Sequence, residues 1–468
     1  MNEHAPAERF VEQLTEIVGA DGVRSGAAVA ALDPGFEPRN LAAGLMARPH
    51  DAAQAARVLA LCSTHGVGVV THGGRTGLSG GARTRPGELI LALDRMTAIE
   101  DIDALGRTAT VQAGVTLAQL DAAAAPYGLT AGIDLGARDS ATIGGMVATN
   151  AGGIDAFRLG TMRERVLGLE VALASGAVLE QLSRVRKDNA GLAVRQLFIG
   201  SEGALGVITR VVIALVPTAG VRHAAFAVVA DIDSAVRVMR AVEARPRATL
   251  VAAELMSGNH IAVTAQALGV SQLSQTPASA FGLLIAVAGG DGEVARNELE
   301  QALCAAADEG LLLDCVLPKN AAEERDLWRV REDWAVDRTY PGGLWYDVSV
   351  PIDRLHGYLV GLTARIRKHD PALSIYVVGH LGDGNVHVTV NAPHPLAGRY
   401  DEIAPIVYAG LREFGGSFSA EHGIGVEKLH SLEQWAGPTG IALMRAIKDL
   451  FDPHGILNPG KVLSRGAA

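Results

Sequence analysis

Ser374–Val390, with the sequence SIYVVGHLGDGNVHVTV, places two apolar, β-rich runs on either side of Asp383-Gly384. An Asp-Gly pair between such runs is typical of a β-hairpin, because a type I′ turn requires a positive φ at both central residues. Counted outward from a two-residue turn, His380 lies directly opposite His387. Directly opposed residues have Cβ atoms about 4.5–5.5 Å apart. The stretch therefore predicts an antiparallel hairpin with two imidazoles on one face.

Two neighbouring imidazoles suit a shared metal ion, and a surface pair without a ligand is the alternative. A third ligand has to come from elsewhere, and the segment 419–428, SAEHGIGVEK, offers Glu421 and His422. Side chains of adjacent residues in an extended segment point to opposite faces, so Glu421 is the candidate ligand while His422 faces another part of the pocket. Together with His380 and His387, Glu421 would form a His₂Glu site for zinc, manganese or iron. A solvated loop is the alternative for this segment.

Length and composition limit the class of protein. The chain has 468 residues, more than one ordinary domain, so we expect two or three. A formal net charge of −10 argues against binding to a nucleic-acid backbone. Three scattered cysteines without a C-x-x-C motif argue against an iron–sulfur cluster or a disulfide framework. With no apolar signal region and no run of about 18 uncharged apolar residues, we expect a cytoplasmic protein without a membrane span.

Short β-rich and helix-like runs alternate along the chain, which predicts an α+β fold. In the first half we expect strands at 67–71, 88–93, 108–113, 167–174 and 207–215, and helices at 8–18, 51–65 and 117–125. In the second half we expect strands at 224–229, 283–288 and 344–350, and helices at 232–243, 292–309, 321–338, 352–369 and 400–414. The second half fits an antiparallel sheet covered by helices. A helix followed by a Pro- and Gly-rich tail is expected over 440–461.

A glycine-rich loop follows the first predicted strand. The segment 71–82, THGGRTGLSGGA, holds five glycines. Loops of this kind present backbone N–H groups to a phosphate and let it approach closely. The loop is neither a Walker loop nor a G-x-G-x-x-G fingerprint, so by itself it indicates a nucleotide only in general terms. A flexible surface loop is the alternative.

This loop, the passage 134–153 (DLGARDSATIGGMVATNAGG) and the segment 200–209 (GSEGALGVIT) together resemble the FAD-binding domain of vanillyl-alcohol-oxidase-type flavoproteins. The second half resembles their FAD-linked oxidase C-terminal domain. HLGDGNVHV and SAEHGIG are similar to motifs of the FAD-linked D-2-hydroxyacid dehydrogenases, the branch with D-2-hydroxyglutarate dehydrogenase, D-lactate dehydrogenase and the glycolate oxidase flavin subunit. The segment 452–461 is similar to the flavin-proximal tail of that family.

The resemblance implies three parts. A two-part FAD-binding domain takes residues 1–218. A substrate domain, an antiparallel sheet covered by helices, takes residues 219–415. Residues 416–468 form a C-terminal segment that returns to the flavin and completes the active site and the FAD site.

The resemblance also implies the FAD contacts. The first loop wraps the pyrophosphate, the second passage lines the path of the adenosine and flavin, and residues 202–207 close around the cofactor. The expected cofactor-binding residues are Gly73, Gly74, Arg75, Thr76, Gly77, Ser79, Gly80, Gly136, Ser140, Thr142, Gly144, Gly145, Thr149, Glu202, Gly206, Val207, Ile208 and Asn458. In covalent relatives a histidine follows the paired glycines and bonds the flavin. This chain has Arg75 there, so we expect non-covalent FAD.

By the same resemblance, His380, His387 and Glu421 hold Zn²⁺ or another divalent metal such as Mn²⁺. His422 is then the catalytic base. A D-2-hydroxy acid chelates a metal through its carboxylate and hydroxyl, and the metal lowers the pKa of that hydroxyl. A neutral histidine then takes the proton while C2 delivers hydride to flavin N5.

Arg331 matches an arginine that binds the substrate carboxylate in the family. A guanidinium suits this role because it binds carboxylates through two parallel hydrogen bonds. A helix-face salt bridge to Glu332 or Asp326 is the alternative.

Three positions depart from the hydroxyglutarate enzymes. Those enzymes commonly place a threonine, a lysine and an asparagine where this chain has Ala335, Trp345 and Thr389. Polar partners for a distal carboxylate are therefore missing. Trp345 and Thr389 are expected to contact the substrate, with Trp345 suited to a shorter or more apolar tail.

The sequence therefore predicts an FAD- and metal-dependent enzyme that oxidises a D-2-hydroxy acid to the 2-oxo acid. Candidate substrates are D-2-hydroxyglutarate, D-lactate and D-malate types. The flavin subunit of a glycolate oxidase-like complex is one alternative, and a non-flavin metal-dependent hydrolase or binding protein is another. Electron-transferring flavoprotein or a quinone is the expected electron acceptor, no nucleic acid is expected to bind, and a homodimer is left open.

Overall fold

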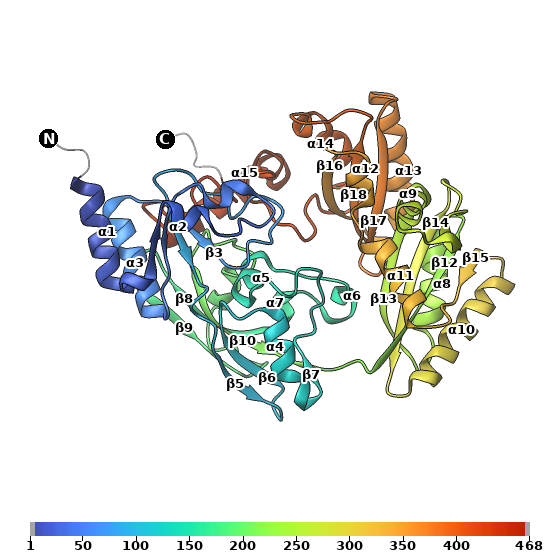
Figure 1. The fold of residues 1–468 in the computed structure, drawn as a ribbon, viewed down its shortest axis with the longest axis horizontal. Helices are drawn as coiled ribbons and strands as arrows, with labels where there is room; N and C mark the ends of the chain where they lie inside the picture. The colour runs from blue at the N-terminus through green and yellow to red at the C-terminus, as the bar shows by residue number, and fades with distance from the viewer. Residues whose placement is uncertain (1–4, 464–468) are drawn as a thin grey trace. The chain divides into compact units, whose positions relative to one another are not determined.

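The computed structural model describes residues 5–463, which form two compact units (Figure 1). The first unit consists of the chain up to Gly153, of Leu159–Thr218 and of the chain from Glu421 onward. The second unit consists of Ile154–Arg158 and Ala219–Ala420. The second unit is thus built by excursions of the chain, which then returns to the first.

Two sheets frame the first unit. One has the order β1-β2-β4-β3, with parallel pairing of β2, β4 and β3. The other has the order β5-β6-β10-β8-β9 and is antiparallel throughout. The strands are β1 (Val23–Ser25), β2 (Leu45–Ala47), β3 (Val69–His72), β4 (Leu89–Ala92), β5 (Ile99–Asp103), β6 (Thr108–Gln112), β8 (Val166–Ala172), β9 (Val178–Gln181) and β10 (Val207–Ala214), with a separate pair, β7 (Leu129–Thr130) and β11 (Val216–Pro217).

Helices close the cores of this unit. The long helices α1 (Ala5–Val18) and α3 (Ala52–His65) share a core cluster with the parallel sheet. Helix α3 begins where the Asp51 carboxylate accepts a hydrogen bond from the N–H of Gln54 at 2.7 Å, which satisfies an otherwise unpaired donor. The remaining helices of this unit are α2 (Ala27–Ala30), α4 (Leu117–Ala124), α5 (Ile143–Thr149), α7 (Met162–Arg165) and α15 (Leu429–Phe451), whereas most of α6 (Ala156–Leu159) belongs to the second unit.

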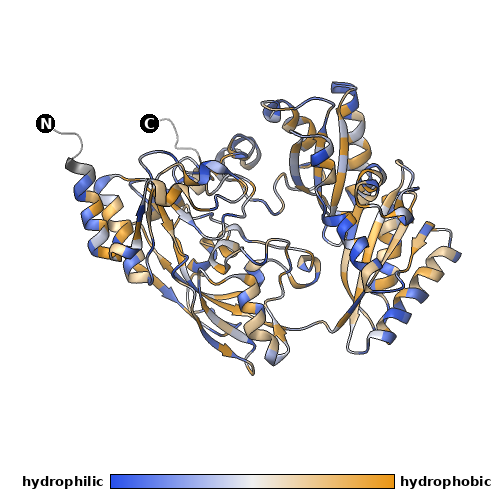
Figure 2. Ribbon diagram, viewed as in Figure 1, coloured by the Kyte–Doolittle hydropathy of each residue, from blue (hydrophilic) through white to orange (hydrophobic). Residues whose placement is uncertain are grey.

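A seven-stranded antiparallel sheet frames the second unit (Figure 1). Its order is β15-β12-β14-β13-β17-β18-β16. The strands are β12 (Val221–Val229), β13 (Thr249–Ser257), β14 (Phe281–Gly289), β15 (Leu312–Val316), β16 (Leu344–Ser349), β17 (Ser374–His380) and β18 (Asn385–Asn391). Figure 2 shows that the strands are mainly apolar, whereas the helices mix apolar and polar residues. This contrast is expected of strands buried beneath amphipathic helices.

The helices of the second unit are α8 (Ile232–Glu243), α9 (Gly258–Leu268), α10 (Gly292–Asp308), α11 (Ala321–Glu332), α12 (Ala335–Thr339), α13 (Ile352–His369) and α14 (Tyr400–Tyr408). Helices α9 and α11 share a core cluster with the sheet face that carries Phe226, Met256 and Leu284. The same face of β13 carries Glu254, because side chains two residues apart in a strand lie on one face. Helix α11 therefore ends close to this face.

Several predicted element bounds are wrong. The single helix expected over 321–338 is two helices, because Asp333 adopts an extended backbone between them. Helix α14 ends at Tyr408, and α15 begins at Leu429 and is kinked at Gly437-Pro438. Within residues 5–463, no helix has the length and apolar character that crossing a membrane requires.

Candidate functional site

Strands β17 and β18 form the predicted hairpin, but the predicted two-residue turn is wrong. The register pairs His380 with Asn385 and Val378 with His387, which leaves a four-residue loop over 381–384. Within that loop only Gly384 has a positive φ, whereas a type I′ turn requires two in succession. Because the register differs from the prediction by two residues, both histidines still lie on one face.

His380 is held by a buried carboxylate. Its Nδ1 lies 2.8 Å from Oε1 of Glu254, which stands directly opposite on β13. Glu254 is 1% exposed and also accepts a hydrogen bond from Nε of Arg331 at 2.7 Å. Burial by itself raises the pKa of Glu254, but the charges and hydrogen bonds of His380 and Arg331 outweigh it and lower the pKa to about 2. Glu254 therefore stays ionised and can accept the Nδ1 proton of His380, which makes Nε2 the candidate ligand atom.

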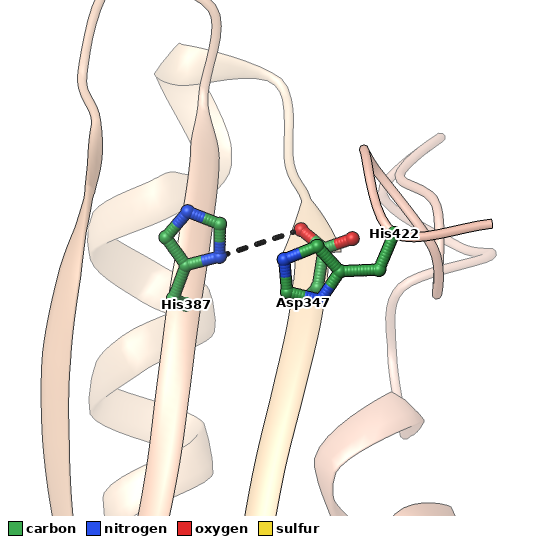
Figure 3. Close-up of side chains that lie close together, drawn as sticks. All are labelled: Asp347, His387 and His422. Atoms are coloured by element: carbon green, nitrogen blue, oxygen red, sulfur yellow. Dashed lines mark ion pairs between the residues drawn. The ribbon is translucent and has the colours of Figure 1, made fainter. Parts of the chain in front are cut away.

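His387 also faces a carboxylate. Asp347 lies opposite on β16, with Oδ1 3.6 Å from Nδ1 of His387 (Figure 3). The Asp347 carboxylate is 1% exposed and accepts a hydrogen bond from Nδ2 of Asn385 at 2.8 Å. It also lies 3.1 Å from the backbone N–H of Ala420. The aspartate thus joins three neighbouring segments beside the imidazole.

Glu421 and His422 directly follow Ala420, whose backbone N–H lies next to the Asp347 carboxylate. Ser417 pairs with Ser349 of β16 in an antiparallel bridge, and the chain then passes through Ala420. Two overlapping groups of ligand atoms lie within 4.8 Å of one another: His380, His387 and Glu421, and Asp347, His387 and His422. The rings of His380 and His387 have centroids 5.7 Å apart. Figure 3 shows the side chains of His387, Asp347 and His422 close together, with the His422 ring overlapping Asp347 in this view.

This donor set fits a divalent metal. A metal-binding imidazole commonly donates its second ring N–H to a carboxylate, which fixes the tautomer and frees the other nitrogen. Glu254 stands in that position for His380. Two imidazoles and one carboxylate with a remaining coordination position are typical of catalytic zinc, and they also suit manganese or iron.

In the first unit, the glycine-rich loop is tightly packed. A Cβ on Gly73 would lie 2.3 Å from Oγ1 of Thr142, and one on Gly74 would lie 1.9 Å from the carbonyl oxygen of Ser140. Thr142 begins α5, and its hydroxyl accepts a hydrogen bond from the N–H of Gly145 at 3.3 Å. The loop thus packs against a side-chain hydroxyl at Gly73 and against backbone at Gly74, where a Cβ cannot be accommodated without a shift of the chain.

Strained backbone clusters around this packing. Arg75, Glu202 and Asn458 have φ values of 56°, 50° and 43°, in the left-handed region that residues other than glycine seldom adopt. The Glu202 carboxylate accepts hydrogen bonds from the N–H groups of Ile424 and Gly425 at 2.7 and 2.9 Å. Burial raises the pKa of Glu202, and these N–H groups act in the opposite direction. Strain of this kind often marks a ligand site.

The other residues predicted to bind the cofactor lie in the same unit. Ser79 donates its hydroxyl to the carbonyl oxygen of Gly423 at 3.3 Å. Val207 and Ile208 begin β10 and bury their side chains in two core clusters, so only their backbone atoms remain for a ligand. The same loops, helix α5 and the segment before β10 hold the rest, which are Thr76, Gly77, Gly80, Gly136, Gly144, Thr149 and Gly206.

The residues predicted to contact substrate lie on the sheet face of the histidines or next to it. The alternative for Arg331 was a salt bridge to Glu332 or Asp326 on its own helix. Arg331 pairs with Glu254 on β13 instead. Trp345 and Thr389 are directly opposed on β16 and β18. Each lies two residues along its strand from Asp347 or His387.

Sequence reasoning missed Glu254 and Asp347. Each is a lone acid inside an apolar strand run, TLVAAELMS for Glu254 and LWYDVS for Asp347. An ionisable group in a buried strand is expensive unless it is paired, so this is the signal that points to them. Their partners depend on strand pairing, which the sequence does not show.

Comparison with known proteins places this geometry in context. The chain matches a family model described as FAD binding domain over residues 43–181. It matches another described as FAD linked oxidases, C-terminal domain, over residues 219–462.

Relatives with the name D-2-hydroxyglutarate dehydrogenase are similar over most of the chain. The Bos taurus mitochondrial protein is 37% identical over 90% of this chain and 76% of its own length. The Xanthomonas citri pv. viticola protein is 35% identical over 89% of this chain and 88% of its own length. The Arabidopsis thaliana mitochondrial protein is 34% identical, covering 90% and 75%.

Solved structures share the fold. p-Cresol methylhydroxylase with substrate bound has a TM-score of 0.70 at 18% identity, covering 98% of this chain and 97% of that one. Alkyldihydroxyacetonephosphate synthase has a TM-score of 0.70 at 18% identity, covering 97% and 84%. The likeness confirms the predicted α+β class and vanillyl-alcohol-oxidase-type fold.

Proposed function

The chain belongs to the FAD-linked oxidases and is an FAD-dependent dehydrogenase, and we propose that it oxidises a D-2-hydroxy acid to the 2-oxo acid at a site that also holds a divalent metal. One observation carries this proposal: the His380, His387 and Glu421 ligand atoms lie within 4.8 Å of one another. The buried Glu254 carboxylate beside His380 supports it. The names of the similar proteins supply the substrate class.

FAD is assigned to the glycine-rich loops of the first unit. When bound, FAD accepts the two electrons that leave the substrate carbon. Gly73 and Gly74 let the loop backbone pack closely on Ser140 and Thr142, and exposed N–H groups of such loops suit a pyrophosphate. Arg75 stands where covalent relatives carry histidine, so we propose that FAD is held without a covalent bond.

The metal is assigned to His380, His387 and Glu421. When bound, a divalent ion polarises the substrate hydroxyl and anchors the adjoining carboxylate. Glu254 accepts the Nδ1 proton of His380 and leaves Nε2 as the ligand atom. Asp347 stands beside His387 in the corresponding position, at a longer distance.

His422 is assigned as the base. Neutral imidazole accepts a proton near neutral pH. An imidazole nitrogen of His422 takes the hydroxyl proton as the C2 carbon–hydrogen bond breaks with its electron pair and the C2–oxygen double bond forms. One proton and one hydride thus leave the substrate, which balances the oxidation. Arg331 donates Nε to Glu254, and we assign its terminal amino groups to a substrate carboxylate.

The alternative functions differ in the partner proteins and cofactors that they require. A glycolate oxidase-like subunit would need partner proteins for turnover, whereas a complete donor set in one chain favours an independent enzyme. We retain electron-transferring flavoprotein or a quinone as the proposed acceptor. A non-flavin hydrolase is not retained, because both matched family models describe FAD-linked domains.

The test uses the purified holoenzyme under anaerobic conditions. Mixing with a panel of D-2-hydroxy acids should bleach the flavin absorbance, and their L enantiomers should not. Isolation of the 2-oxo acid in an amount equal to the reduced flavin would complete the assignment. A flavin that no D-2-hydroxy acid reduces contradicts the proposal.

A further inference from the structure

The row of side chains next to the histidine pair has an aromatic ring at each end. Across the last three strands of the sheet, Tyr376 opposes Thr389, and Thr389 opposes Trp345. Side chains two residues apart in a strand share a face, so Trp345 and Thr389 lie on the face of Asp347 and His387. Two residues along a strand span about 6.5–7 Å. This row therefore lies directly next to His387 on the same face of the sheet.

Helix α12 and its flanks add two more rings. Trp334 packs against Trp345 with ring centroids 5.1 Å apart, and Tyr340 packs against Tyr376 at 5.6 Å. The break after α11 lets this segment cross the row. Trp334 is 46% exposed, so it presents apolar surface next to the ring of Trp345. Nε1 of Trp345 donates to Oδ1 of Asp337 at 2.9 Å, which fixes the indole ring.

The charges near the row do not favour a second carboxylate. Arg331 pairs with Glu254, and Arg338 pairs with Asp333. Asp337 adds a carboxylate beside Trp345, and burial raises its pKa. A buried carboxylate requires a cation or several donors, and a second carboxylate beside Trp345 would instead meet the Asp337 carboxylate.

We propose that the aromatic row, defined as Trp334, Tyr340, Trp345 and Tyr376, binds an uncharged, apolar tail of the substrate, an aryl or branched alkyl group. The proposal rests on the function proposed above and narrows its substrate class. It separates this chain from the relatives whose names specify hydroxyglutarate, which carries a second carboxylate. Trp345 is then a specificity-determining residue, because it lies diagonally across from His387 in register and its indole ring is fixed by Asp337.

The experiment compares kcat/KM for D-lactate, D-2-hydroxy-4-methylpentanoate, D-phenyllactate, D-malate and D-2-hydroxyglutarate with a dye acceptor, using the FAD- and metal-loaded enzyme. The larger apolar acids should exceed D-2-hydroxyglutarate by about 10-fold or more, the range that added apolar contacts give in a pocket. D-Lactate, which has almost no tail, should lie below the larger apolar acids. D-2-Hydroxyglutarate as the best substrate would overturn the proposal.

Variants locate the effect. Trp345→Gln should reduce kcat/KM for D-phenyllactate about 10-fold more than for D-lactate, chiefly through KM, whereas Trp345→Phe should retain most of the preference. Trp345→Lys should raise the ratio of D-2-hydroxyglutarate to D-phenyllactate about 10-fold above that of Trp345→Gln. Trp328→Phe, a matched change on α11 against the unit's core, should leave all the ratios unchanged.

The outcomes separate the two proposals. If no D-2-hydroxy acid, D-lactate included, reduces the flavin, the proposed function fails. If D-2-hydroxy acids are oxidised but Trp345→Gln changes every substrate by the same factor, only the assignment of the tail fails.

Discussion

Glu254 and His380 stand directly opposite each other on β13 and β17, with the Glu254 Oε1 2.8 Å from the His380 Nδ1. The residues are far apart in sequence, so only the pairing of these strands brings them together. The same carboxylate accepts a hydrogen bond from Nε of Arg331, so Glu254 connects helix α11 with the proposed ligand His380. One buried acid thus orients both a proposed metal ligand and a proposed substrate-binding arginine.

Replacing Glu254 with glutamine should weaken metal binding by about 10–100-fold, because the carboxylate that orients His380 is lost. The flavin spectrum should stay unchanged, since the predicted FAD residues lie in the other unit. Titration of metal-free protein with zinc measures the affinity. Glu298→Gln is the matched control, because Glu298 is also buried and paired with arginines but lies away from the histidines. Equal zinc affinity in all three proteins would contradict the orienting role.

His422→Asn should lower turnover by roughly 10²–10⁴-fold, the contribution typical of a general base. Substrate binding should change far less, because the carboxylate contacts are assigned to other residues. Stopped-flow flavin reduction over a range of substrate concentrations separates the limiting rate from the dissociation constant. A variant that reduces flavin at the wild-type rate but binds substrate weakly would assign His422 to binding.

His72 should make the first unit sensitive to acid. Burial lowers the pKa of His72 to about 4 from an ordinary 6.5, and its Nε2 lies 2.9 Å from the carbonyl oxygen of Ala82. A group with a depressed folded-state pKa contributes stability above pH 6.5 that is lost as the pH falls towards 4. The difference corresponds to about 3 kcal/mol in total, of which about 2 kcal/mol is lost by pH 5.

The measurement is thermal unfolding of holoenzyme at pH 7.5 and pH 5. His72→Gln keeps an N–H donor and cannot be protonated, so its Tm should fall less between the two conditions than that of the wild type. The exposed His430 provides the control, and His430→Gln should follow the wild type. Parallel curves for all three proteins would show that His72 does not titrate on unfolding.

Gly74→Ala should disrupt the packing of the glycine loop, because a Cβ there would lie 1.9 Å from the carbonyl oxygen of Ser140. We expect weaker FAD retention on gel filtration and a loss of about 1–3 kcal/mol or more in stability. Gly357→Ala is the control, since a Cβ at Gly357 on α13 would meet nothing within 4 Å. FAD retention equal to that of the control would show that the close approach is not needed.

The hairpin shows how far the sequence could be read. Alternating β-rich runs around Asp383-Gly384 predicted the two strands and the common face of the histidines. The turn length was wrong because a four-residue loop with one positive φ also accommodates Asp-Gly. The error shifted the register by two residues, which preserves the face of every side chain.

The two buried acids beside the histidines could not be predicted from the sequence, for a different reason. Glu254 and Asp347 reach their histidines through strand pairings that no local pattern encodes. Arg331 was considered for a salt bridge within its own helix, yet its partner Glu254 lies on a strand. The roles of the individual site residues and the boundaries 1–218, 219–415 and 416–468 stay predictions.

The most direct test of the metal site is anaerobic flavin reduction by a D-2-hydroxy acid before and after metal removal. Chelator-treated enzyme, with metal content measured by elemental analysis, should keep its FAD spectrum and lose reduction of the flavin by substrate. Zinc or manganese should restore reduction in the wild type but not in His380→Ala or Glu421→Ala. Full-rate reduction in enzyme proven to be metal-free would contradict the account.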